Sequence, residues 1–103
     1  MKHRFREREL VVYEKQKHGA RPGPRARDLR PAAHGEDYDY VVDKFWVVVA
    51  VRPDDHLRVQ TPGGKLRELE VGDPHLRPAT VRERLWLRFR DRRRLDALLH
   101  ARV

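Results

Sequence analysis

Residues 40–71, YVVDKFWVVVAVRPDDHLRVQTPGGKLRELEV, decide the fold because they have the pattern of three β-strands joined by two tight turns. Both faces of the first strand are apolar from Phe45 to Val51, which is typical of a central strand or of a strand covered on its outer face by another segment. The turns carry Pro53-Asp-Asp-His56 and Thr61-Pro-Gly-Gly64, where proline presets φ and glycine permits a positive φ. The stretch therefore predicts an antiparallel meander.

The segments on either side of this meander extend the prediction to a single domain over residues 1–103. In residues 9–15, Leu10 and Val12 fall on one face and Val11 and Tyr13 on the other, a pattern that predicts a first strand. We expect this strand and the meander to form a β core over residues 9–71. The apolar phase changes between Leu66 and Leu69, and we expect a β-bulge near Arg67-Glu68 that curls the sheet. The fold class is therefore mainly β: a small curled antiparallel sheet of four or five strands followed by a C-terminal helix.

Residues 16–37 show neither helical nor strand periodicity and contain prolines at positions 22, 24 and 31. They predict a long loop after the first strand. Loops of this length in a compact domain are usually functional or disordered. The prolines favour an extended backbone that suits a binding arm, and a solvated insertion without a role is the alternative.

The C-terminal segment, residues 80–100, has the signals of a helix. Thr80 and Glu83 have the spacing of a capping box, in which each side chain accepts a hydrogen bond from the other residue's backbone N–H. We expect an apolar stripe to pack on the core, with a second short helix after a break in register at Arg92-Arg93-Arg94. The stripe comprises Val81, Leu85 and Phe89, with Trp86 beside it, and Leu95, Leu98 and Leu99 belong to the second helix. A strand over residues 80–90 is the competing interpretation.

The formal net charge of +8 is unevenly distributed along the chain. Residues 15–34 carry +5 and residues 77–94 carry +6, whereas residues 35–55 carry −4. Segregated basic charge is the electrostatic signature of nucleic-acid binding. The chain also has 19 arginines to 5 lysines and lacks isoleucine and asparagine, as GC-rich codon usage would produce. Function and codon bias both remain explanations of the arginines.

The residues that usually carry catalysis are sparse, and we expect a protein that is not an enzyme. The chain contains no cysteine and no serine, and its six histidines follow no metal-ligand spacing, so we expect no metal and no cofactor. Gly63-Gly64-Lys65 connects two strands and therefore does not form a phosphate loop. No apolar run approaches the ~18 residues of a membrane span, and we expect a cytoplasmic protein with no membrane contact.

The order of a first strand, a long excursion and a three-stranded meander resembles the small SH3-like barrels of the KOW and Tudor type. That resemblance implies closure of the sheet into a barrel. Arg8-Glu9 stand where KOW modules have Gly-Asp. This departure weakens any inference of RNA binding from the resemblance to that fold. The sequence is also similar to a group of short uncharacterised bacterial proteins with three shared motifs. These are Pro22-Gly23-Pro24-Arg25-Ala26, Val42-Asp43-Lys44-Phe45-Trp46 and Asp73-Pro74-His75-Leu76-Arg77.

Two classes of binding function follow from these patterns. In the first, a basic loop contacts the phosphates of RNA or of a ribonucleoprotein such as the ribosome, and exposed tyrosines offer stacking faces. The predicted nucleic-acid-binding residues are Lys15, Lys17, Arg21, Arg25, Arg27, Arg30, Tyr38 and Tyr40. In the second, the acidic rim (Glu36, Asp37 and Asp39) and the basic loop bind a charged protein, including an acidic partner or a second copy. We expect Trp46 and Trp86 to lie in the core.

Overall fold

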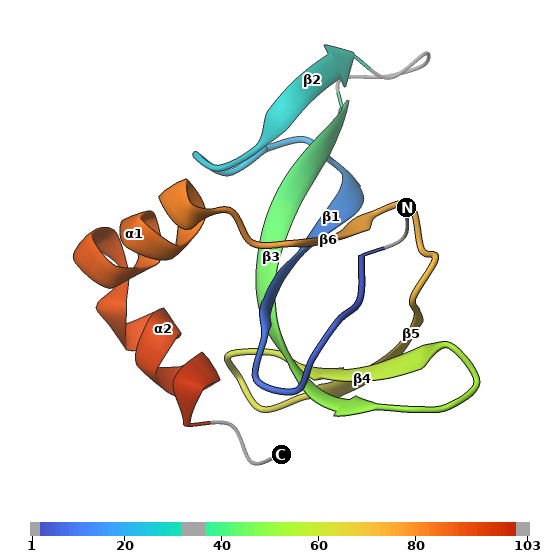
Figure 1. Cartoon of the computed structure of the whole chain (residues 1–103). Helices are drawn as coiled ribbons and strands as arrows, with labels where there is room; N and C mark the ends of the chain where they lie inside the picture. Colours follow the sequence, from blue (N-terminus) through green and yellow to red (C-terminus); the bar gives the residue numbers. More distant parts are fainter. Residues whose placement is uncertain (1–2, 32–36, 101–103) are drawn as a thin grey trace.

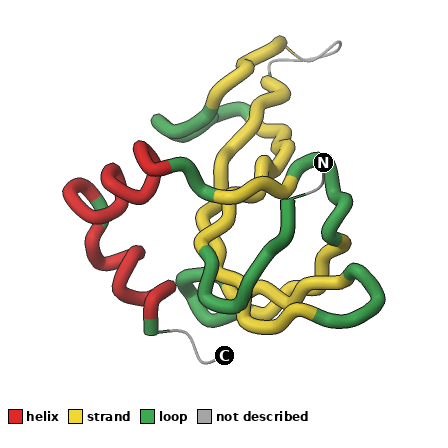
Figure 2. Tube along the Cα trace, viewed as in Figure 1, coloured by secondary structure: helices red, strands yellow, loops and turns green. Residues whose placement is uncertain are grey.

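The computed structural model describes residues 3–31 and 37–100, which form one antiparallel sheet and two helices (Figures 1 and 2). The strand order in the sheet is β5-β4-β3-β1-β6, and β2 pairs with β3 outside this path. The elements are β1 (Leu10–Gly19), β2 (Arg27–Pro31), β3 (Tyr38–Val51), β4 (His56–Gln60), β5 (Leu66–Glu70), β6 (Leu76–Pro78), α1 (Val81–Arg90) and α2 (Arg92–Leu99).

Strand β3 organises the sheet. On one edge it pairs with the whole of β1, from Leu10 opposite Val47 to Gly19 opposite Tyr38. On its other edge β4 pairs with residues 47–51 and β2 with residues 38–41. Among the described strands, none pairs with residues 42–46 of β3 on that edge. Residues 42–46 of β3 therefore form an unpaired stretch of this edge, between β2 and β4.

The predicted loop over residues 16–37 is wrong in its extent. Strand β1 continues to Gly19 because the N-terminal half of β3 pairs with it, and β2 lies inside the predicted loop. Asp28 has a φ of 53°, within the interval between Arg27 and Arg30 where the register of β2 shifts. Only residues 20–26 connect β1 to β2, and residues 32–36 lie outside the described part of the chain.

The sheet is mainly β and curled, as predicted, but it does not close into a barrel. Six strands are present where four or five were expected, and in the described residues the outermost strands, β5 and β6, do not pair with each other. The bulge predicted near Arg67-Glu68 is also wrong, because β4 and β5 keep an unbroken register. Leu66 is exposed, so no bulge is needed to bring Leu66 and Leu69 to the same buried face.

Two hydrophobic cores lie on opposite faces of β1 and β3. The outer core, under the helices, comprises Leu10, Val12, Phe45, Val47, Val49, Ala79, Leu87 and Leu98. The inner core, inside the curl of the sheet, comprises Phe5, Val11, Trp46, Val48, Leu57, Val59 and Leu76. This arrangement confirms that β3 is apolar on both faces because both are covered, and that Trp46 is a core residue.

The capping box at the start of α1 is confirmed, since the Glu83 N–H donates to Thr80 Oγ1 and the Thr80 N–H donates to Glu83 Oε1. Residues 81–90 are therefore helical, and the alternative strand is wrong. The second helix is also present, with the break at Asp91, one residue before the arginine triplet. No helix in residues 3–31 or 37–100 has the length and apolar character needed to cross a membrane.

The face of α1 that packs on the sheet differs from the prediction. Leu87 is fully buried, whereas the expected apolar stripe is exposed and Trp86 remains 40% exposed. The ion pair of Glu83 with Arg77 in β6 fixes the orientation, because residues 83 and 87 share a face of the helix. At about 100° per residue, the stripe of residues 81, 85 and 89 points to the opposite side.

Candidate anion-binding site

A pocket of about 330 Å³ opens at the interval of β3 that β2 and β4 leave uncovered. Five of its lining side chains are cationic, and the lining contains no carboxylate. We call it the basic pocket. Its cations are Lys15, Arg25, Lys44, Arg67 and Arg94, and Phe45, Trp46, Thr61 and Pro62 complete the lining.

Each cation reaches the pocket from a different element. The register of β1 and β3 places Lys15 opposite Val42, and Lys44 opposite Tyr13, so the two lysines share one face of the sheet as diagonal neighbours. Arg25 lies in the turn closed by the hydrogen bond from the Ala26 N–H to the Gly23 carbonyl oxygen. Arg67 belongs to β5 and Arg94 to α2. The pocket therefore exists only in the folded chain.

The cations of the pocket lie close enough to perturb one another. Burial lowers the pKa of Lys44, and the charges of Lys17, Arg25 and Lys15 lower it further. Burial and then Arg25 lower the pKa of Arg94, although Asp91, 3.1 Å from its guanidinium, acts in the opposite direction. A bound anion would relieve this repulsion. The pocket thus has the electrostatics of an anion-binding site.

The predicted site residues divide between this pocket and its surroundings. Lys15 and Arg25 line the basic pocket. Lys17, Arg30 and Tyr40 line a second hollow of about 610 Å³, together with Gln16, His18, Asp28, Asp39 and Val41. Arg21 and Tyr38 are exposed and line neither hollow. Lys15 and Lys17 are two residues apart on the same face of β1 and line one hollow each, so the two hollows adjoin along this strand.

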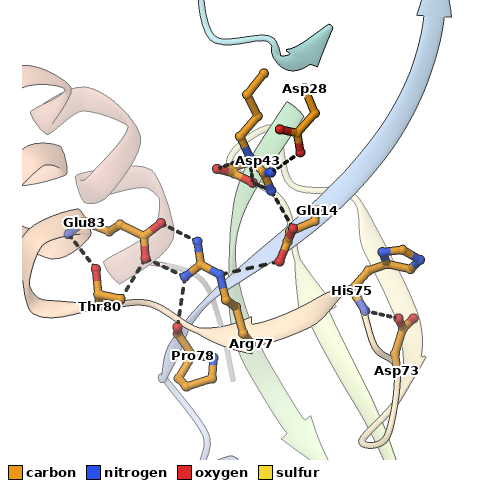
Figure 3. Close-up of polar contacts among 10 residues, drawn as sticks. Glu14, Asp28, Asp43, Asp73, His75, Arg77, Pro78, Thr80 and Glu83 are labelled. Carbon is orange, nitrogen blue, oxygen red and sulfur yellow. Dashed lines mark hydrogen bonds and ion pairs between the residues drawn. The ribbon is translucent and has the colours of Figure 1, made fainter. Parts of the chain in front are cut away.

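Arg27, predicted to contact phosphate, has its guanidinium occupied by carboxylates. Figure 3 labels these carboxylates, which belong to Glu14, Asp28 and Asp43. Arg27 donates to Asp43 over 2.9 Å, to Asp28 over 2.9 Å, and also to Glu14. The hydrogen bonds that Arg27 donates to Asp43 and Glu14 raise the pKa of Arg27. This arrangement holds β2 against β1 and β3, and does not favour the predicted contact of Arg27 with phosphate.

The same ion pairs continue to the helices. Arg77 Nε lies 3.7 Å from Glu14 Oε1, and its terminal nitrogens donate to both oxygens of Glu83 (Figure 3). These hydrogen bonds, above all, lower the pKa of Glu83 to about 2. The chain Asp43, Arg27, Glu14, Arg77 and Glu83 links β3, β2, β1, β6 and α1 on the helix-facing side of the sheet.

The acidic rim predicted as a protein-binding surface is only partly described. Glu36 lies outside the described residues, and Asp37 and Asp39 both bind His18. Its Nδ1 lies 2.8 Å from Asp39 Oδ1 and its Nε2 lies 3.1 Å from Asp37 Oδ2. These contacts, with the hydrogen bond to Asp39 foremost, raise the pKa of His18. Within residues 3–31 and 37–100, no three histidine or carboxylate side chains gather as a metal site requires.

Sequence reasoning missed Lys44, Arg67 and Arg94. The signal for Lys44 was its place two residues before Trp46 on the same face of a strand, but its neighbours Lys15 and Arg25 become known only with the register of β1 and the path of residues 20–26. Arg67 carried no local signal, and Arg94 was indicated only as one of many arginines in the basic segment 77–94.

Comparisons with known proteins assign no family to this arrangement. The chain matches no protein-family model, no curated protein and no solved structure. The resemblance to SH3-like barrels and to the short bacterial proteins stays a prediction, and the basic pocket is the feature of this chain that points to a function.

Proposed function

We propose that this protein is a non-enzymatic binding module that holds the phosphate backbone of single-stranded RNA in the basic pocket. The observation that carries this proposal is the convergence of Lys15, Arg25, Lys44, Arg67 and Arg94 on one hollow that no carboxylate lines. Lysine and arginine neutralise phosphates by direct contact and by release of counterions, which supplies most of the affinity of nucleic-acid binding. Such contacts position a strand without reading its sequence.

The size of the pocket favours a flexible strand over a duplex. A hollow of about 330 Å³ has room for one phosphodiester group and part of its sugar, whereas a duplex presents its phosphates on a wide, stiff cylinder. From the pocket, Lys17 leads toward the second hollow, where Tyr40 is half-buried beside Arg30. Base stacking on an aromatic ring next to cations is a common way to bind single strands without sequence preference.

Fluorescence anisotropy with a labelled oligouridine of roughly 12 nucleotides tests the proposal. If the module contacts about four phosphates, the slope of log K against log salt is expected to be about −3. The double variant Arg25→Gln, Lys44→Gln weakens the contact with the one phosphate in the basic pocket and should flatten the slope by up to about 0.7. The matched control is Arg52→Gln, Lys65→Gln, since both residues are exposed and neither lines the pocket.

Three results would decide against the proposal: no salt-dependent affinity of the native protein for the RNA, equal loss in the pocket variant and the control, or an unchanged slope in the pocket variant. Competition identifies the ligand further. Inorganic phosphate that displaces the strand at low concentration would indicate a small anionic ligand. DNA of the same sequence that binds equally well would show that the ribose hydroxyl is not read.

A further inference from the structure

The exposed side of α1 is an apolar surface that the basic pocket does not use. Val81 and Phe89 are 72% and 74% exposed, and Leu85 and Trp86 are 46% and 40% exposed. We call these four residues the α1 face. They lie on adjacent turns of one helix of 10 residues, which extends about 15 Å. Soluble proteins seldom leave large apolar side chains clustered in this way unless the surface binds something.

The α1 face is held rigidly by the rest of the fold. The capping box fixes the first turn, Arg77 binds Glu83 from β6, and Leu87 anchors the opposite side of the helix in the outer core. The Trp86 ring stacks on Phe45 with a centroid distance of 6.0 Å and an interplanar angle of 18°. A partner would therefore meet an ordered surface and lose little affinity to ordering it.

The charges around the α1 face are mostly positive. Arg82 and Arg90 line it directly, and Arg88 lies 5.8 Å from the centroid of the Phe89 ring. The single carboxylate in the lining, Glu83, is engaged by Arg77 and by the Thr80 N–H. Asp96 lines the adjoining groove between the helices together with Arg84, Arg88 and Arg92. A complementary partner is therefore anionic around an apolar centre.

We infer that the α1 face binds an acidic amphipathic helix of a partner protein. An apolar face of this length accepts side chains at positions i, i+3 or i+4, and i+7 of a docked helix, and glutamates or aspartates beside those anchors would meet the arginines. A second copy of this chain is disfavoured because a two-fold contact would oppose identical arginine sets. Nucleic acid is the weaker fit because Val81 and Leu85, half of the α1 face, offer no ring for base stacking. Trp86 and Phe89 do offer rings beside Arg82 and Arg90, so RNA affinity lost in Val81→Gln, Phe89→Gln would assign the face to nucleic acid. This surface extends the role of the protein beyond RNA binding.

The test uses a labelled synthetic helical peptide of about 14 residues, with leucines and a phenylalanine on one face and glutamates on the other. We expect Val81→Gln, Phe89→Gln to weaken its binding by about tenfold or more, because exposed anchors carry most of the affinity of such contacts. Arg82→Glu, Arg90→Glu should weaken it similarly and should bind the matching lysine peptide instead. The charge-matched control Arg52→Glu, Lys65→Glu should retain binding of the glutamate peptide.

Several outcomes would overturn the inference. They are no binding of the glutamate peptide at about 100 μM, equal binding of the lysine peptide by the native protein, or no effect of the apolar variant. If the native protein dimerises and Val81→Gln, Phe89→Gln does not, the face binds a second copy. If the native protein binds anionic vesicles and this variant does not, the face binds a lipid surface. RNA affinity should be the same in the apolar variant and the native protein, so this inference and the proposed function fail separately.

Discussion

Arg77 in β6 binds Glu83 in α1 through both terminal nitrogens of its guanidinium, at 2.6 Å and 2.8 Å from the two carboxylate oxygens. Glu83 Oε1 also accepts the Thr80 N–H of the capping box. The same carboxylate therefore caps the helix and attaches it to the sheet. This double role explains why Leu87, one turn later, faces the outer core while the predicted apolar stripe faces outward.

The Arg77 and Glu83 pair predicts how stability depends on acid. The pKa of Glu83 is about 2 in the folded chain against 4.5 for a free carboxyl, so its stabilisation is complete above pH 4.5 and is lost as the pH falls from 4.5 to 2. Over this window, we expect the free energy of unfolding of the native protein to fall by on the order of 2 kcal/mol more than that of Glu83→Gln. Thermal unfolding of both proteins at several pH values measures this difference. Parallel losses in the two proteins would contradict it.

Arg27 is expected to act on stability and not on RNA binding. Arg27→Gln leaves Glu14 and Asp43 without their shared cation and should lower the free energy of unfolding by about 1 kcal/mol. Arg30→Gln is the matched control on β2, since Arg30 is exposed and forms no ion pair with any other described residue. Chemical denaturation measures both variants. A flatter salt slope for RNA binding in Arg27→Gln would show that its guanidinium reaches phosphate after all.

The orientation of α1 can be tested by comparing two leucines two residues apart. Leu87 is completely buried and Leu85 is 46% exposed. Leu87→Ala should lower the free energy of unfolding by about 2–5 kcal/mol because it opens a cavity in the outer core. Leu85→Ala should change it by less than about 0.5 kcal/mol. The reverse order of the two midpoints in urea would mean that α1 packs through its apolar stripe.

His18 should titrate above its usual range because its ring bridges two carboxylates. The hydrogen bond to Asp39 is the main cause of its raised pKa, followed by the contacts with Asp37. The stabilisation that protonated His18 provides through these two carboxylates is complete below pH 6.5, the ordinary pKa of histidine. It declines as the pH rises through the higher pKa of the folded state. A proton NMR titration of the ring should show the raised pKa, and Asp39→Asn should lower it more than Asp37→Asn does. An equal pKa in native protein and Asp39→Asn would refute the bridge.

The elements that local patterns define were predictable from the sequence. The meander of residues 40–71, the capping box of Thr80 and Glu83, and the break between two helices follow from periodicity, turn residues and cap spacing, and all three are present. Strand β2 was not predictable because its Arg27-Asp-Leu-Arg-Pro31 sequence has no alternation of buried residues, and its place depends on pairing with β3. The packing face of α1 depended on an ion pair to another element.

The candidate site was partly predictable for the same reason. Composition indicated a basic region near residues 15–30, and Lys15 and Arg25 do line the basic pocket. Charge counting could not distinguish Arg27, which neighbouring carboxylates occupy, from Arg25, for which no ion pair with another described residue exists. Nor could it bring Arg67 and Arg94 to the same hollow, because that requires the curl of the sheet and the position of α2.

The presence of two cores on opposite faces of β1 and β3 has a consequence for how the protein opens. The helices contribute Leu87 and Leu98 to the outer core and none of the inner-core residues. Partial unfolding can therefore release the helical layer while β4, β5 and the N-terminal segment still hold the inner core together. Amides of α1 and α2 then exchange with solvent by a lower-energy route than those of Trp46 and Val48, and the fold has two cooperative units that share two strands.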